Sequence, residues 1–438
     1  MLSVLCLAHP AQAQRARDES DAAASPLVAA GVRLGEAGAP RADAAPQAAA
    51  PALPPVTAGP DGIAIQSADG DFRLQFGVLL HAEGRFAIGD DDAAVVDTFA
   101  VRRLRPYMRG RFARRFEFYL NPDFAGGTLV VQDAYLDTIF SPAFRVRMGK
   151  GKTPFGMERL HPASNLLFFE RAFPTAIVPN RDVGVQVLGD LAGGRINYLA
   201  GVMNGVNDGG SADVDSTDSK DIAGRVVVRP FAQRPAASPL RGIAVGIAGT
   251  RGTQAGAAAL PAYRTQSLQQ PYFSYSGATA DGTRVRYSPQ AFYYFKAIGA
   301  FAEYVTSTLP VAKAGVREDI GHSAWQVAAS YVLTGETATD AGNGVRPRAN
   351  FDFGNGNWGA VQVTARYHAL SVDEAARTLG FAAAGTSLEA AAWTAGVNWY
   401  LTPNVRYTAN VERTVFDDDP DGPRPVEHAF AFRMQLSF

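Results

Sequence analysis

The chain has 438 residues, 47% of them hydrophobic, and its 41 basic and 42 acidic residues give a formal net charge of −1. This balance excludes the overall positive charge with which proteins attract nucleic acid. No stretch reaches the roughly 20 consecutive apolar residues of a membrane-spanning helix, so a membrane location would require a closed β-barrel, which satisfies every backbone polar group without helices.

The first 13 residues are predicted to belong to a secretory signal peptide. An apolar stretch precedes Ala11 and Ala13, which form an A-x-A cleavage site. Because the positively charged n-region is missing, we expect the true start to lie upstream. Cys6 is the single cysteine, which excludes an intramolecular disulfide framework. It is not expected to be a lipoprotein cysteine, because Leu5 stands where a small residue is required.

Residues 14–60 are dominated by alanine, proline and glycine with scattered charges. Such a composition cannot bury enough apolar surface to offset the entropy of ordering, so we expect a disordered or loosely ordered leader. From residue 61 the sequence changes to short alternating segments separated by glycine, proline, asparagine and aspartate. We therefore expect one β domain over residues 61–438.

Alternation with period two indicates strands that have one wet and one apolar face. Near the end of the chain, Phe430, Phe432 and Met434 share one face, and Arg433 and Gln435 share the other. The pattern predicts about sixteen strands, near residues 72–88, 98–112, 114–123, 128–139, 143–150, 182–190, 194–203, 221–230, 242–251, 286–296, 298–307, 323–334, 357–369, 389–401, 404–414 and 427–438.

A soluble β-sandwich also alternates, so a secreted adhesin is an alternative. Short turns such as residues 402–404, however, alternate with long polar stretches such as residues 207–221 and 252–282. Short turns at one end and long loops at the other are typical of outer-membrane barrels. The chain also ends on Phe438 in an amphipathic strand, which resembles the signal read by the barrel-assembly machinery. We therefore predict an all-β fold, a transmembrane antiparallel β-barrel.

An arginine row marks the second expected strand. On one face lie Arg103, Arg105, Arg109 and Arg111. Four guanidinium groups cannot face lipid, where each would destabilise the barrel by about 2–4 kcal/mol at the midplane, so they must line the lumen. Arg102 breaks the alternation, which places it at a rim, at a bulge or in a subunit contact.

A second basic group consists of Arg145, Arg147, Lys150 and Lys152. It leads into residues 153–181, a segment that is too apolar for a solvent loop and too rich in proline for a strand. We expect this segment to fold into the barrel as a constriction loop. The alternative is an outside loop that packs against neighbouring subunits.

Several motifs together resemble the phosphate-selective porin O and P family. They are residues 148–159 (MGKGKTPFGMER), 168–171 (FFER), 181–186 (RDVGVQ) and 133–136 (DAYL), together with the arginine-rich second strand. The resemblance implies a trimeric, sixteen-stranded porin of the Gram-negative outer membrane. It also implies conduction of anions, in some members phosphate or polyphosphate, past Arg102, Arg103, Lys150 and Lys152 near the constriction. Lysine is scarce in this chain, a departure from the best-known phosphate-selective members.

The function that we expect is passive diffusion of small anions, with phosphate as one candidate. The expected pathway residues are Arg102, Arg103, Arg105, Arg109, Arg111, Arg145, Arg147, Lys150 and Lys152. The alternative is a nonspecific general-diffusion porin, in which Glu117, Asp123, Asp133 and Asp137 neutralise the arginines. No catalytic motif, metal constellation or cofactor motif is present in the sequence, so we do not expect an enzyme. Acidic loop tips are expected to be solvated or to contact lipopolysaccharide through divalent cations.

Overall fold

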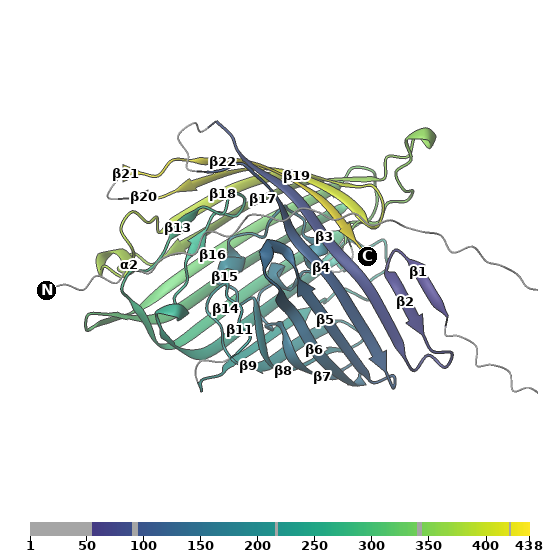
Figure 1. Cartoon of the computed structure of the whole chain (residues 1–438), viewed down its shortest axis with the longest axis horizontal. Helices are drawn as coiled ribbons and strands as arrows, with labels where there is room; N and C mark the ends of the chain where they lie inside the picture. Colours follow the sequence, from purple (N-terminus) through teal and green to yellow (C-terminus); the bar gives the residue numbers. More distant parts are fainter. Residues whose placement is uncertain (1–54, 90–94, 215–217, 340–343, 420–421) are drawn as a thin grey trace, which may run out of the picture. The chain divides into compact units, whose positions relative to one another are not determined.

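The computed structural model describes residues 55–89, 95–214, 218–339, 344–419 and 422–438, so the expected signal peptide and most of the expected leader lie outside the described residues. Within these ranges, 16 antiparallel strands form a closed barrel (Figure 1). They are β3 (Arg73–Ala87), β4 (Thr98–Phe112), β5 (Phe116–Asp123), β6 (Val130–Ser141), β7 (Phe144–Lys152), β8 (Arg181–Leu191), β9 (Ile196–Met203), β10 (Asp221–Val228), β11 (Ile243–Gly256), β14 (Thr279–Phe295), β15 (Ile298–Lys313), β16 (Val316–Val332), β17 (Ala360–Val372), β18 (Glu389–Tyr400), β19 (Val405–Phe416) and β22 (Glu427–Ser437).

The barrel closes where β22 pairs with β3, for example through Phe430↔Phe86. The first residues of β3 pair instead with a short hairpin, β1 (Val56–Gly59) and β2 (Gly62–Gln66). Since β1 falls within residues 14–60, regular structure begins a few residues earlier than the composition indicated.

Each expected strand corresponds to a strand of the barrel, and the prediction of a β-barrel is confirmed. The expectation of a loop over residues 252–282 was partly wrong, because β11 continues to Gly256 and β14 begins at Thr279. The parts of β11 and β14 that extend beyond the expected strands consist of small and polar residues, such as Gln254, which pairs with Gly282. Such residues leave no apolar face, so they carry no alternation signal.

The outer surface of the strands is apolar. Along β22, Phe430, Phe432 and Met434 are exposed, and Arg433 and Gln435 are buried on the inner face, as the alternation predicted. Aromatic rings from neighbouring strands cluster on this surface, with Tyr367 packed between Trp325 and Trp393. An apolar outer surface is the face that a membrane barrel presents to lipid. None of the helices in the described part of the chain is long and apolar enough to cross a membrane.

The two ends of the barrel differ. One end, here called the turn end, carries both ends of the strand series and short connections such as residues 142–143 and 296–297, but also two longer ones, residues 229–242 and 333–359. The other, here called the loop end, carries longer connections such as residues 204–220 and 257–278. The remaining short elements lie in connections: β12 (Tyr263–Arg264), β13 (Pro271–Phe273), β20 (Asp418–Asp419), β21 (Gly422–Pro423), α1 (Pro174–Ile177), α2 (Ala375–Thr378) and six 3-10 turns, Ala125–Gly127, Glu158–Leu160, Ala163–Asn165, Pro239–Gly242, Ala257–Ala259 and Phe353–Asn355.

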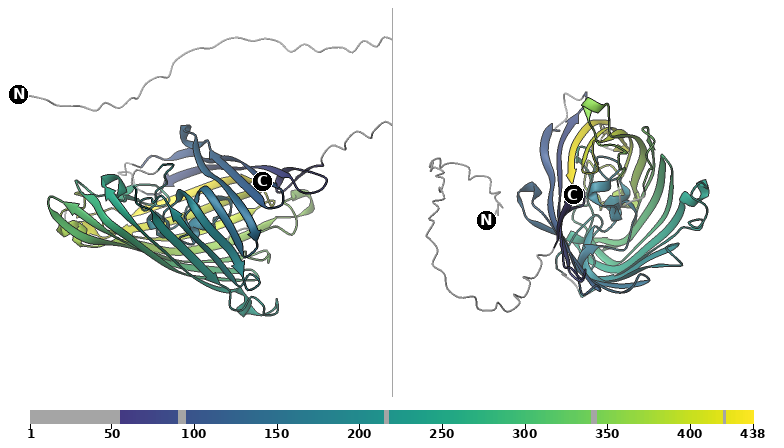
Figure 2. Two further views of the ribbon diagram at one scale, coloured as in Figure 1. Left: turned by 90° about the horizontal axis from the view of Figure 1, so that it is seen from below. Right: turned by 90° about the vertical axis from the view of Figure 1, so that its right-hand side faces the viewer.

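Residues 153–180, here called the inward loop, connect β7 to β8 and lie inside the ring of strands (Figure 2). Because the loop has no strand partner, its backbone needs side-chain partners, and the barrel wall supplies them. Asn410 accepts a hydrogen bond from Phe169 N at 2.8 Å, and Gln435 donates one to the Ser164 carbonyl at 2.9 Å. The expectation of a loop folded into the barrel is confirmed.

The inward loop fills one side of the barrel. Phe155, Phe173 and Ile177 are fully buried against the inner face of β15 to β18, in a cluster that includes Val305 and Leu370. The loop-end segments 257–278 and 373–388 contribute to the same cluster. Open space is therefore found on the opposite side, along β3 to β10.

Candidate functional site

The arginine row of β4 lies on the inner face, as the alternation predicted. Arg103 and Arg105 are 3% and 8% exposed. Arg102 occupies a β-bulge, because His81 of β3 pairs with Arg103 whereas the next residue, Ala82, pairs with Val101. A bulge was one of the three places expected for Arg102. The extra residue lets two successive arginines reach the same partner.

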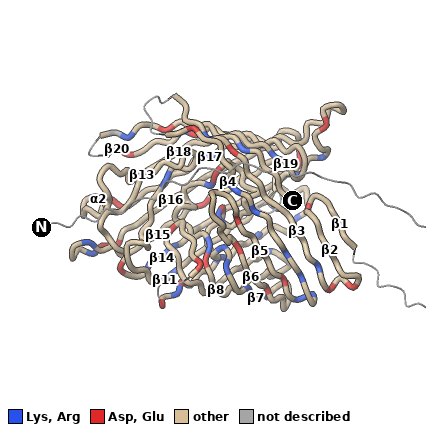
Figure 3. The backbone as a smooth tube through the Cα atoms, viewed as in Figure 1, with Lys and Arg blue, Asp and Glu red and all other residues tan. Residues whose placement is uncertain are grey.

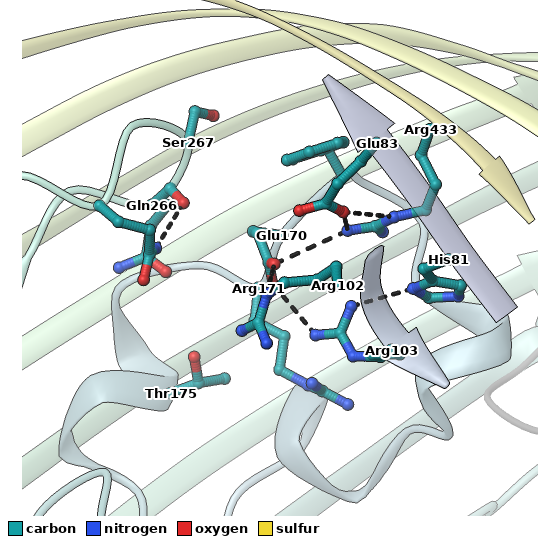
Figure 4. A network of polar contacts seen from close by, with 12 residues as sticks. His81, Glu83, Arg102, Arg103, Glu170, Arg171, Thr175, Gln266, Ser267 and Arg433 are labelled. Carbon is teal, nitrogen blue, oxygen red and sulfur yellow. Dashed lines mark hydrogen bonds and ion pairs between the residues drawn. The ribbon is translucent and has the colours of Figure 1, made fainter. Parts of the chain in front are cut away.

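That partner is Glu170 of the inward loop (Figure 4). Its carboxylate lies 3.1 Å from Arg102 Nε and from Arg85 Nη2, 3.3 Å from Arg103 Nη2 and 3.6 Å from Arg433 Nη2. Burial alone would raise the pKa of Glu170, but Arg103, Arg102 and Arg433 outweigh it and hold the pKa well below its usual value. Glu170 therefore stays ionised and ties the inward loop to β3, β4 and β22.

The charge of this network is not balanced. Arg433 and Arg85 also bind Glu83, each at 2.7 Å. Four arginines, those that contact Glu170, thus share two carboxylates. Two positive charges remain in excess near the inward loop.

Some of the expected pathway residues form ion pairs with acidic residues that would neutralise them in a nonspecific porin. Asp123 binds Arg105 at 2.7 Å, Asp137 accepts two hydrogen bonds from Arg147 at 2.7 and 2.8 Å, and Glu117 lies 3.9 Å from Arg145. Lys150 forms an ion pair with Asp213 in the 204–220 connection. At these positions the positive charge of the basic residue is therefore neutralised by an acidic partner.

Two other members of the β4 row have no ion pair with any described residue. Arg109 is exposed to the lumen, with its guanidinium 5.4 Å from the centre of the Tyr119 ring. Arg111 has a buried Nε without a hydrogen-bond partner among the described residues. Of the two, Arg109 lines the cavity described below.

A further basic group surrounds the inward loop and is here called the loop cation cluster: Lys152, which was expected in the pathway, and Arg159, Arg171 and Arg181, which were not. Lys152 donates to the carbonyls of Leu160 and His161 at 2.9 and 2.8 Å, and Arg171 donates to the carbonyl of His161 at 2.9 Å. Neutral carbonyls orient these cations without cancelling their charge.

The cations of this cluster repel one another. Burial, followed by the charge of Arg181, lowers the pKa of Arg159 to about 10. Burial, followed by Arg159 and Arg103, holds the pKa of Arg171 well below its usual value. Arg181 has an acidic partner, Asp133, at 3.2 Å. A mutually repelling cluster that is partly open to the lumen is stabilised by a bound or passing anion. Arg159 and Arg171 stand in motifs that carried the family resemblance, but nothing in those motifs indicated that they converge.

A cavity of about 810 Å³ lies between the inward loop and the turn end; it is lined by β3 to β10 and also by residues of β18, β19, β22 and the 333–359 connection. Basic positions follow this side of the barrel (Figure 3). Its lining contains two acidic residues, Asp61 and Asp133, and nine basic ones: Arg73, Arg105, Arg109, Arg147, Lys152, Arg181, Arg225, Arg346 and Arg406. Counting also Asp123 and Asp137, which pair with lining arginines, nine basic side chains face four acidic ones.

Residues 80–438 match the family described as phosphate-selective porin O and P. The chain belongs to this family. It is a porin of the Gram-negative outer membrane, which makes the turn end periplasmic and the loop end extracellular. Family and fold indicate a channel rather than an enzyme. A search of curated proteins found no match to the sequence.

Solved structures share the fold at low identity. The outer-membrane channel DcaP of Acinetobacter baumannii is 13% identical, with a TM-score of 0.54 over 85% of this chain and 99% of that one. OmpT of Vibrio cholerae, in its trimer form, is 13% identical, with a TM-score of 0.52 over 84% and 99%. An anion-selective porin from Comamonas acidovorans is 11% identical, with a TM-score of 0.51 over 84% and 100%. Such identities support the barrel fold alone.

Proposed function

We propose that small anions diffuse passively through this porin along the basic wall of β3 to β10. The observation that carries the proposal is the excess of basic over acidic residues in the cavity below the inward loop. Guanidinium groups donate to phosphate or carboxylate oxygens, and a series of weak sites lets an anion both enter and leave. The expected residues Arg105, Arg109, Arg147 and Lys152 line this cavity.

The other expected residues take different places along the same pathway. Arg102 and Arg103 contact Glu170 at the inward loop, and the Lys150 contact with Asp213 leads toward the extracellular end. Arg111 and Arg145 stand near the periplasmic ends of β4 and β7. To these we add the other three members of the loop cation cluster, Arg159, Arg171 and Arg181, of which Arg181 lines the cavity.

The nonspecific porin is the second candidate, and the pairs formed by Asp123, Asp133 and Asp137 favour it. The two candidates differ in ion selectivity. We expect the reversal potential in a potassium chloride gradient to shift toward the chloride equilibrium potential. A selectivity near unity would support the nonspecific candidate, and cation preference would overturn both readings of the basic wall.

Two matched variants test whether the arginine row of β4 determines the ion selectivity. Arg109→Ala removes a lumen charge that has no acidic partner among the described residues, so it is expected to lower the chloride-to-potassium permeability ratio. Arg251→Ala removes an exposed arginine near the extracellular end of β11 and is expected to leave the ratio unchanged. Equal ratios in both variants would show that the β4 row does not face the ion path.

Phosphate selectivity is proposed from the family, and a titration tests it. Phosphate added at constant chloride should reduce the chloride current if the basic wall binds it. Anion selectivity without such a block would leave a general anion porin.

We further propose a homotrimer that contacts lipopolysaccharide and is recognised by the barrel-assembly machinery through Phe438. The trimer form of the structurally similar OmpT supports the trimer. The mass of the protein in detergent, measured by light scattering, tests it, and a monomer would contradict it.

A further inference from the structure

Three tyrosine rings cross the inner wall side by side. Tyr107 of β4, Tyr119 of β5 and Tyr135 of β6 all line the cavity below the inward loop. The ring centres of Tyr107 and Tyr119 lie 5.9 Å apart, and those of Tyr119 and Tyr135 lie 5.7 Å apart. Tyr119 and Tyr135 are direct cross-strand partners. The rings therefore form a continuous aromatic row, here called the tyrosine row.

A glycine in the wall positions the first ring. A Cβ atom at Gly77 of β3 would lie 2.4 Å from Cζ of Tyr107, so only glycine leaves room for this ring against the wall. The Tyr107 hydroxyl also donates to the Phe438 carbonyl at 2.7 Å. The ring is thereby held along the wall rather than across the lumen.

Each of the other two rings is associated with a guanidinium. The Arg147 guanidinium lies 3.7 Å from the centre of the Tyr135 ring, and that of Arg109 lies 5.4 Å from the centre of the Tyr119 ring. Leu188 and Leu199 of β8 and β9 line the same cavity. Arg147 is bound to Asp137, so the charge that remains for a ligand is that of Arg109. Planar rings, apolar side chains and this positive charge are thus combined on one surface.

A hydrated inorganic anion gains nothing from the rings or from the leucines. An aromatic carboxylate uses all three features, because its carboxylate pairs with a guanidinium and its ring packs against tyrosine. We infer that the tyrosine row and its arginines form a binding subsite for aromatic carboxylates. This inference rests on the proposed anion pathway and names the class of solute that the pathway favours.

Two probes of equal charge and similar size test the subsite, benzoate and cyclohexanecarboxylate. Their permeabilities relative to chloride are obtained from reversal potentials of the full-length porin in planar bilayers. We expect benzoate to be favoured by about two- to tenfold, the factor for one aromatic contact. Equal permeabilities with anion preference intact would overturn this inference alone, whereas loss of anion preference would overturn the proposed function.

Variants assign the effect to the row. Tyr119→Leu combined with Tyr135→Leu should abolish the preference for benzoate, and Tyr119→Phe, which keeps the ring, should retain it. Tyr287→Leu serves as the control, because Tyr287 is 51% exposed on the outer face of β14. Folding of each variant is checked by its heat-modifiable migration on gels. If the double leucine variant does not fold, Tyr119→Leu alone is expected to weaken the preference, and an unchanged preference would overturn the inference.

Discussion

Glu170→Gln removes the carboxylate that joins the inward loop to the barrel wall. The side chain keeps its size, but Arg85, Arg102 and Arg103 lose an anionic acceptor at 3.1 to 3.3 Å, and Arg433 loses one at 3.6 Å. Removing one partner of a buried ion pair destabilises a protein by about 3–5 kcal/mol. An amide oxygen still accepts one hydrogen bond, so we expect a loss near 3 kcal/mol.

The assay is urea unfolding of the porin in detergent micelles, compared with Glu374→Gln. Glu374 pairs with Arg377 at 3.4 Å with its side chain 60% exposed, so its loss should change the free energy of unfolding by less than about 1 kcal/mol. Glu170→Gln also removes one negative charge from the lumen, so the permeability ratio for chloride over potassium should rise. Unchanged stability together with an unchanged ratio would refute the role of Glu170 as the anchor of the inward loop.

Three further perturbations test other contacts. Asp123→Asn should raise the chloride permeability ratio, because it frees Arg105 from its ion pair; a fall in the ratio would contradict this reading. Gly77→Ala should destabilise the barrel by about 1–3 kcal/mol through the clash with Tyr107, measurable by the same unfolding assay, and an equally stable variant would contradict the close approach. Since the pKa of Arg159 is lowered to about 10, its charge is present below that pH and lost above it. Anion preference should therefore fall as the pH rises through 10, and the loss should be smaller in Arg159→Met. The folded state holds this proton less tightly than the unfolded chain, so stability should rise over the same pH range.

The strands could be predicted because each is specified locally, by one apolar face toward lipid and one polar face toward water. The same locality made the bulge at Arg102 visible as a break in the alternation. Where a strand extends out of the membrane, both of its faces contact water. The last residues of β11 and the first residues of β14 therefore show no alternation of apolar and polar residues from which a strand could be predicted.

The contacts of the site could not be predicted in the same way. Glu170 meets arginines from three strands that are far from it in the sequence, and nothing in its neighbours along the chain indicates that. Within the loop cation cluster, Lys152 was expected, but Arg159 and Arg171 were missed for a related reason: they follow no strand pattern, and their convergence depends on how the inward loop folds against the wall.

The partners of the inward loop also order the events of assembly. The loop follows β7, yet the side chains that hold its backbone come from strands near the other end of the chain, such as Asn410 of β19 and Gln435 of β22. A nascent barrel that lacks those strands offers the loop only part of its final contacts, those with β15 to β18. Complete docking of the inward loop is therefore coupled to closure of the seam between β22 and β3.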